Sequence, residues 1–486
     1  MKVSSAEWLI NDIQTDDYLR SLNTNNSIYV KRIEELANEF FPQFKTSNDS
    51  YLSIDADDNK IFSEVLSQFN LLPDGWSLPD FQIPFYNIEA IRADFPILSE
   101  KVEGKNLIWL DNAATTQKPK CVIDRLAYFY EHENSNIHRG AHTMAARATD
   151  AYEESREKIR RFLNASDVSE IIFVRGATEA INLIAQTYGK ANLNEDDEVL
   201  VSCLEHHANI VPWQILCSEK GAHLRVIPID DNGQVNLEEY NQMLGPKTKI
   251  VSFAHVSNAL GTIVPVKEMI KTAHEFGAKV LVDGAQAVSH LKVDVQNLDA
   301  DFYVFSGHKI YGPTGIGVLY GKQDILNRMK PYHGGGNMIQ DVTFNKTQYR
   351  AAPYRFEAGT GNIADAVGLG TAIDYISQIG LDTIWAYEHS LLDYGTEILK
   401  NVPRLKLIGN AKDKTSILSF VISGVENELI GQALNTEGIA VRAGHHCAQP
   451  VLRRLGLEGT VRPSLAMYNN KKELDRMVEA LMRLQY

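Results

Sequence analysis

Short runs rich in β-branched residues alternate with amphipathic stretches from about residue 105 of this 486-residue chain. The run "EIIFVRG" precedes "ATEAINLIAQTYGK", "DEVLVSC" precedes "ANIVPWQILCSEKG", and "KIVSFAH" is followed by "PVKEMIKTAHEFG". The runs "AKVLVDGA" and "DFYVFSGH" come next. Strands that alternate with helices predict the α/β class, with a mostly parallel sheet covered by helices on both faces.

Polar side chains follow these predicted strands directly. They are Thr178, His206, Asn258, Asp283, Gln286, Ser306, His308 and Lys309. Ligands of such sheets bind at the carboxyl ends of the strands. The pattern therefore predicts a binding site at that edge of the sheet.

The first part of the chain has a different composition. Residues 1–85 hold 6 Lys and Arg against 14 Asp and Glu, a net charge of −8 out of −14 for the whole chain. Their apolar spacing is helix-like, and "LPDGWSLPDFQIP" suits a linker. We predict four segments along the chain. A helical extension and linker covers 1–85, a large domain covers 108–372, and a smaller C-terminal α/β domain covers 373–486. Residues 86–107 start the catalytic region and are expected to pack with the smaller domain.

Composition also narrows the partners. A net charge of −14 disfavours nucleic acid and anionic membranes, which both attract clustered Lys and Arg. No run of 18 apolar residues and no secretory signal is present, which favours the cytoplasm. Cys121, Cys203, Cys217 and Cys447 are scattered without a CxxC pair, as is typical of a reducing compartment.

Several strand-end residues suggest chemistry when they are taken one by one. A lysine such as Lys309 can form a Schiff base with a carbonyl cofactor, although a solvated loop lysine is the ordinary alternative. Asp283 can keep a pyridine nitrogen protonated, or simply belong to a turn. Ala177 and Thr178 open a helix whose N-terminus suits a phosphate, or Thr178 is a plain helix cap. His206 can stack on a flat ring, sit in a turn or bind a metal.

The stretch "RAGHHCAQP", residues 442–450, joins two histidines to Cys447. A zinc site is disfavoured because adjacent histidines do not easily reach one tetrahedral ion and a further ligand is missing. A polar, arginine-bearing setting lowers the pKa of a thiol and makes it reactive. A buried, inert cysteine is the other interpretation, and these residues alone leave it open.

The ordered set of motifs resembles the Suf-type (group II) cysteine desulfurases, which are fold-type I pyridoxal-phosphate enzymes. The resemblance runs from about Ile88 to the C-terminus, and residues 1–85 match nothing in it. Gly361 and Ala443 stand where proline and threonine are frequent in the family. The motifs are "DNAATTQKP", "NIHRGAHT", "VRGATEAINL", "EHHANIVPW", "HVSNALGT", "LVDGAQAV", "FYVFSGHKIYGPTGIG", "RFEAGTGN" and "RAGHHCAQP".

The resemblance implies a cofactor, pyridoxal 5′-phosphate, and residues that hold it. Lys309 would bind it covalently, Asp283 would pair with its ring nitrogen, Gln286 would bind its phenolic oxygen, and His206 would stack on its ring and act as acid and base. The phosphate would be held by residues of both subunits of a dimer. One subunit would supply Ala177, Thr178, Ser306 and His308, and the second subunit would supply Thr360.

The resemblance also implies a reaction. L-cysteine would be converted to L-alanine, with its carboxylate held by Arg442 and Arg462. Asn258 would lie near both the cofactor oxygen and the substrate, and His138 would contact the substrate. Cys447 would accept the sulfur as a persulfide and pass it to a Suf-type acceptor protein for iron–sulfur cluster assembly. A homodimer is expected, and no metal, nucleic acid or membrane is expected to take part.

Other functions stay open at this point. A selenocysteine lyase would use the same pocket, and an aminotransferase or kynureninase-like enzyme would leave Cys447 without a task. A catalytically inactive assembly scaffold is the alternative from another class, disfavoured by Lys309, Asp283 and Cys447. The acidic extension, with Trp8 and Trp76, is expected to be a docking or regulatory appendage rather than a flap on the catalytic domain.

Overall fold

The computed structural model describes residues 86–138, 140 and 142–484. The predictions for residues 1–85 lie outside this range. From Asn87 onward the chain forms one compact unit, and the rest of this section concerns that unit.

A seven-stranded sheet forms its centre, in the order β4-β10-β9-β8-β7-β5-β6. The strands are β4 (Ile171–Val174), β5 (Glu198–Ser202), β6 (His223–Ile227), β7 (Thr248–Ala254), β8 (Lys279–Asp283), β9 (Phe302–Ser306) and β10 (Gly317–Gly321). Strands β6, β5, β7, β8 and β9 pair in parallel, and β10 is antiparallel to both β9 and β4. The predicted mostly parallel sheet is therefore confirmed.

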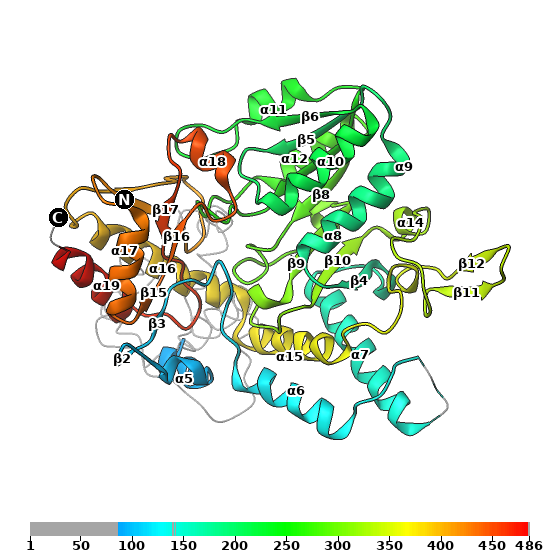
Figure 1. Ribbon diagram of the computed structural model, residues 1–486, viewed down its shortest axis with the longest axis horizontal. Helices are drawn as coiled ribbons and strands as arrows, with labels where there is room; N and C mark the ends of the chain where they lie inside the picture. The colour runs from blue at the N-terminus through cyan, green and yellow to red at the C-terminus, as the bar shows by residue number, and fades with distance from the viewer. Residues whose placement is uncertain (1–85, 139, 141, 485–486) are drawn as a thin grey trace, which may run out of the picture. The chain divides into compact units, whose positions relative to one another are not determined.

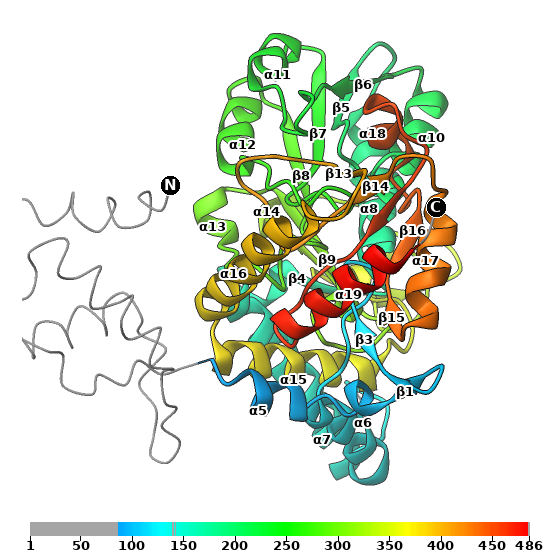
Figure 2. The ribbon, with the colours of Figure 1, turned by 90° about the vertical axis from the view of Figure 1, so that its left-hand side faces the viewer.

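Helices cover both faces of this sheet, as the alternating pattern predicts. Figure 2 shows α12 (Val266–Glu275) and α13 (Val295–Leu298) on one side and α8 (Ala177–Ile184) and α10 (Val211–Lys220) on the other. The central strands are buried on both faces, which is why they read as continuous apolar runs and not as alternating ones.

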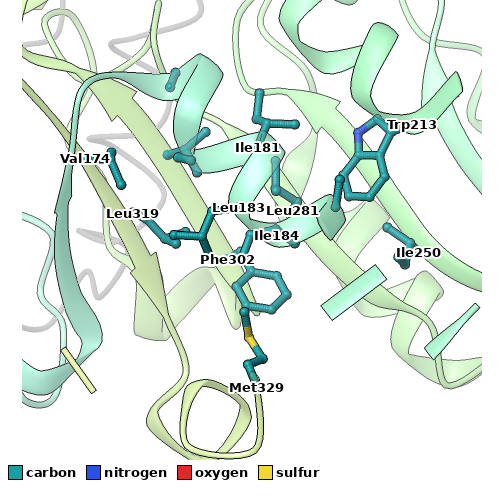
Figure 3. Close-up of a cluster of buried hydrophobic side chains, with 14 of the residues drawn as sticks. Val174, Ile181, Leu183, Ile184, Trp213, Ile250, Leu281, Phe302, Leu319 and Met329 are labelled. Atoms are coloured by element: carbon teal, nitrogen blue, oxygen red, sulfur yellow. The ribbon is translucent and has the colours of Figure 1, made fainter. Parts of the chain in front are cut away.

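A large apolar cluster joins α8 and α10 to the sheet (Figure 3). Ile181, Leu183 and Ile184 of α8 meet Leu281, Phe302 and Leu319 from three strands, and Trp213 of α10 closes one end of the cluster. Because this interior is closely packed, the strand ends and the start of α8 are held in defined positions.

A second, antiparallel sheet has the order β13-β14-β17-β16. Its strands are β13 (Leu405–Leu407), β14 (Phe420–Ile422), β16 (Arg442–Gly444) and β17 (Thr460–Arg462). It has its own apolar core with α16 (Leu381–Leu399), α17 (Asn427–Thr436) and α19 (Lys471–Arg483).

The early part of the chain returns to this second region. Strand β3 (Ile108–Trp109) pairs in parallel with β15 (Ile439–Ala440). The predicted boundary between residues 372 and 373 falls inside a continuous helix, α15 (Ile363–Ile379), so the exact division into domains stays a prediction.

Figure 1 also shows further helices and a β-hairpin outside the two sheets. Helix α5 (Ile88–Ala93) precedes α6 (Lys120–His132) and α7 (Thr143–Phe162), and α15 packs against both α6 and α7. The hairpin β11 (Ile339–Val342) and β12 (Thr347–Tyr349) projects from the body. Among the described helices, none combines the length and apolar character that a membrane span requires.

Candidate active site

A pocket lies at the carboxyl ends of β5, β7, β8 and β9 and is closed by residues of β16, β17 and the loop after β16. It brings together all of the predicted site residues except Thr360 and His138. Those present are Ala177, Thr178, His206, Asn258, Asp283, Gln286, Ser306, His308, Lys309, Arg442, Cys447 and Arg462. Ala113, Ala114 and His446 also line it.

Lys309 ends a short 3-10 helix, Gly307–Lys309, that directly follows β9. Burial lowers the pKa of its amine to about 8, although the nearby Asp283 carboxylate acts in the opposite direction. Burial raises the pKa of Asp283, whose Oδ1 accepts a hydrogen bond from the backbone N–H of Ala285 at 3.0 Å. A strand-end amine and a buried carboxyl thus share one pocket.

The turn between β4 and α8 places Ala177 and Thr178, at the start of α8, in the lining of the same pocket. The Ala177 N–H donates to Ser306 Oγ at 2.9 Å, which ties the start of α8 to the end of β9. Burial lowers the pKa of His308 to about 4, so its imidazole is neutral at physiological pH. The N-terminus of α8, together with the Thr178 and Ser306 hydroxyls, suits a phosphate group.

His206 lies between β5 and the 3-10 helix His207–Asn209. Its Nδ1 accepts a hydrogen bond from the backbone N–H of Ala208 at 3.0 Å. Burial, followed by the charge of Lys309, lowers its pKa to about 3. The neutral ring therefore carries its proton on Nε2, the tautomer set by the Ala208 contact.

Two arginines lie side by side on neighbouring strands of the second sheet. Arg442 of β16 is the register partner of Arg462 of β17, so both side chains lie on the same face. Arg462 is buried and donates to the Asn258 carbonyl oxygen at 2.8 Å and to Asp111 Oδ1 at 3.1 Å. Burial lowers its pKa to about 10, which still leaves it charged at neutral pH. Paired guanidinium groups suit a carboxylate ligand.

Asp111 is a functional contact that reading the sequence missed. It belongs to the quoted motif "DNAATTQKP", but nothing in the spacing linked it to an arginine some 350 residues later. Burial raises its pKa, and the charge of Arg462 counters that effect. Its carboxylate holds one side of the Arg462 guanidinium and so orients it.

The loop that carries Cys447 has an unusual backbone. His446 and Cys447 have φ angles of 53° and 54°, the left-handed region, which costs about 1–3 kcal/mol for each such residue. The His446 ring is buried and its Nε2 lies 2.8 Å from Thr460 Oγ1, while its pKa is lowered to about 2 by burial. Cys447 is half-buried and lines the same pocket as Lys309.

Two predicted residues lie elsewhere. Thr360 is exposed, with its hydroxyl 3.5 Å from Asn136 Oδ1. His138 Nε2 lies 2.8 Å from Glu153 Oε1. Neither lines the pocket of its own chain, so their roles in phosphate and substrate binding stay predictions. Within the described residues, no three His, Cys, Asp or Glu side chains are placed to hold a metal ion.

The fold and the strand-end lysine define a fold-type I transferase that uses pyridoxal phosphate. Residues 108–477 match the family model "Aminotransferase class-V", and the chain belongs to this family. Relatives within it are named cysteine desulfurases, and the chain is similar to them over about four-fifths of its length.

A cysteine desulfurase of Synechococcus elongatus is 64% identical over 400 residues, which cover 82% of this chain and 64% of that protein. The chain thus spans less than two thirds of the length of this relative. A cysteine desulfurase of Escherichia coli O7:K1 is 48% identical over 400 residues, covering 82% and 98% of the two chains. The crystal structure of the E. coli cysteine desulfurase CsdA matches with a TM-score of 0.77 at 38% identity, covering 82% and 98%.

Pyridoxal 5′-phosphate is the cofactor of this family, and the residues present fit it. Asn258 Oδ1 and Arg462 Nε are buried and have no hydrogen-bond partner among the described residues. Such orphaned polar atoms are rare in a protein interior and indicate a polar ligand. A buried lysine, a buried carboxyl and a helix N-terminus in one pocket match an aldehyde, a pyridine nitrogen and a phosphate.

The lowered pKa of Lys309 leads to a test on protein freed of cofactor. Only the neutral amine reacts with acetic anhydride, so the labelling of Lys309 should rise with pH and reach half its maximum near pH 8. Ordinary surface lysines titrate near 10.4 and should continue to gain reactivity above pH 9. Mass spectrometry of the Lys309 peptide measures this, and a half-maximum at 10 or above contradicts the prediction.

Proposed function

We propose that the protein is a cysteine desulfurase of the Suf type, which converts L-cysteine to L-alanine and delivers sulfur through Cys447. The observation that carries the proposal is a thiol on a left-handed loop that lines the same pocket as a buried strand-end lysine. Neither an aminotransferase nor a kynureninase-like enzyme requires that thiol.

The bound cofactor would supply an electron sink next to the substrate α-carbon. Lys309 would hold it covalently and, once displaced by the substrate amine, would move the α-proton. Asp283 would hold the proton on the ring nitrogen, and Gln286 would bind the phenolic oxygen. His206, neutral and with its proton on Nε2, would serve as the other acid and base at the pocket.

Sulfur transfer would be a substitution at the substrate sulfur. The Cys447 thiolate would form an S–S bond to that sulfur while the Cβ–S bond of the substrate breaks and its electron pair stays with the carbon skeleton. Protonation of that skeleton gives alanine, and Cys447 keeps the sulfur as a persulfide. A thiol of an acceptor protein would then remove it, and no external oxidant is needed.

Direct measurement of alanine tests this function. We expect the purified protein with its cofactor to form alanine from L-cysteine, and to form it faster when a Suf-type acceptor is added. L-selenocysteine offered in competition separates desulfurase from lyase: preference for selenocysteine would favour the lyase. Absence of alanine from either substrate would favour the scaffold and overturn the proposal.

Arg442 gives a further prediction about the substrate. Charge-assisted hydrogen bonds to a carboxylate contribute about 1.5–3 kcal/mol, so Arg442→Met should raise the KM for cysteine by roughly 10- to 150-fold. Arg453→Met is the matched control, since Arg453 pairs with Glu458 at the surface. Steady-state kinetics of both variants decide this, and an unchanged KM in Arg442→Met argues against the carboxylate clamp.

We also propose a cytoplasmic homodimer that supplies sulfur for iron–sulfur clusters. The position of Thr360, exposed and away from its own pocket, supports a role in the phosphate site of a second subunit. All four cysteines are free, which suits a reducing compartment. Light scattering that finds an active monomer would contradict the dimer.

We propose that residues 1–85 serve docking or regulation and take no part in the chemistry. Their separate charge and their absence from the matched family region, 108–477, support this. Removal of residues 1–85 should leave cofactor binding and acceptor-free cysteine turnover unchanged. An insoluble or cofactor-free truncation would instead indicate a flap that stabilises the catalytic region.

A further inference from the structure

The backbone of the Cys447 loop is held from two sides. On the pocket side, Asn258 Nδ2 donates to the carbonyl oxygen of His446 at 2.7 Å, and the buried His446 ring contacts Thr460. On the other side, the contacts come from two histidines that have no role in the chemistry proposed above. These are His207 and His445.

His445 holds the loop through its ring. Its Nδ1 accepts a hydrogen bond from the backbone N–H of Cys447 at 3.0 Å, and its carbonyl oxygen accepts one from Ala448 at 2.8 Å. Because Nδ1 is the acceptor, the ring must be neutral with its proton on Nε2 for this contact to exist.

His207 contacts the backbone of Cys447 and of Gln449. Its backbone N–H donates to the Cys447 carbonyl oxygen at 2.8 Å, and its Nε2 accepts from the backbone N–H of Gln449 at 3.3 Å. The His207 and His445 rings stack with their centroids 5.9 Å apart and an interplanar angle of 28°. The pair therefore satisfies both backbone groups of Cys447 and one of Gln449.

We infer that His207 and His445 are positioning residues that together hold Cys447 in its left-handed, pocket-facing conformation. The inference rests on the proposed role of Cys447 as sulfur acceptor and deepens it. Two successive left-handed residues, His446 and Cys447, are unfavourable by themselves, so the conformation persists only where surrounding contacts impose it. On the side away from Asn258, the His445 ring and the His207 backbone N–H hold the two backbone groups of Cys447, and the His207 ring holds the N–H of Gln449.

This arrangement separates holding Cys447 from building the pocket. The contacts of His446 with Asn258 and Thr460 do not involve the imidazole pair, so they persist when an outer contact is removed. Loss of a contact made by the His207 or His445 ring should then make the Cys447 backbone more mobile, while the residues that hold the cofactor stay in place. A sulfur carrier must face the substrate in one step and an acceptor in the next.

The decisive experiment compares two substitutions of His445 in the protein with cofactor bound. His445→Ala removes the acceptor. His445→Asn keeps one, because an asparagine Oδ1 accepts from the N–H two residues further on, as in an Asx-turn. Hydrogen exchange of the Cys447 amide and the rate at which iodoacetamide alkylates Cys447 are measured in each. We expect both to rise about fivefold in His445→Ala, the equivalent of one hydrogen bond, and to return toward wild type in His445→Asn.

Two substitutions of His207 give the same kind of comparison at the Gln449 amide. The Oε1 of His207→Gln can replace Nε2 as acceptor, whereas His207→Leu has none. We expect exchange of the Gln449 amide to rise about fivefold in His207→Leu alone. His223→Asn, an exposed histidine at the start of β6, is the control and should match wild type. The visible spectrum of the bound cofactor shows that each variant is folded at the pocket.

Two outcomes overturn the inference. One is wild-type exchange in both His445→Ala and His207→Leu. The other is exchange in His445→Asn and His207→Gln as fast as in the variants without an acceptor, which would mean that ring packing alone matters. Neither measurement needs turnover. A failure of the proposed function, seen as no alanine formation by wild type, is therefore distinguished from a failure of the inference about His207 and His445.

Discussion

Replacement of Cys447 by serine is expected to lower alanine formation from cysteine on the order of 10⁴-fold, the scale seen when a covalent nucleophile is removed. Lys309, Asp283 and the two arginines stay in place, so cysteine should still enter and change the visible spectrum of the cofactor. A serine hydroxyl is far less ionised than a thiol at neutral pH and cannot store sulfane sulfur. The sulfur would then have no acceptor.

Mass spectrometry after incubation with cysteine locates the added sulfur in wild type. The other three cysteines do not line the pocket, and burial raises the pKa of Cys203 and raises that of Cys217 to about 11. Cys121→Ser is the matched control and should keep wild-type activity. Wild-type alanine formation by Cys447→Ser, or sulfur found on another cysteine, would refute the central claim about the loop.

Replacement of Lys309 by alanine should lower turnover by roughly 10³-fold or more, because one side chain supplies both the covalent attachment and a proton transfer. The variant should also lose the visible absorption that depends on the lysine linkage. Cofactor should still bind through contacts at the start of α8, where the Ala177 N–H and Ser306 Oγ are already joined.

Lys118→Ala is a comparison for that experiment, since this second lysine also has a pKa lowered to about 8 by burial but lies outside the pocket lining. Its ammonium donates to the His308 carbonyl oxygen at 3.2 Å. Lys118→Ala should keep the visible absorption band. Alanine formation by Lys309→Ala at the wild-type rate would contradict the proposal that Lys309 binds the cofactor covalently.

The order of elements and the edge at which ligands bind could be predicted from the sequence alone. Alternating apolar runs and amphipathic stretches encode strands and helices locally, and the polar residues after each strand, such as Asp283 and Lys309, mark the carboxyl edge. The motifs of the chain added the family, because their residue types and order are specific even without coordinates.

Contacts between distant residues needed the tertiary structure. The pairing of Arg442 with Arg462 follows from the register of β16 and β17, and the support of Arg462 by Asp111 joins the two ends of the described chain. Thr360 and His138 show the same limit, since their motifs were visible while their distance from the pocket was not.

The state of the site was also decided by folding. The left-handed conformation of Cys447, the acceptor nitrogen of His445 and the lowered pKa of Lys309 depend on burial and on neighbours that no local window contains. The sequence by itself therefore determined which reactive side chains the protein contains and the order of its helices and strands. Only the tertiary structure decided how those groups are oriented and charged, because hydrogen-bond geometry and desolvation arise from packing between segments far apart in the chain.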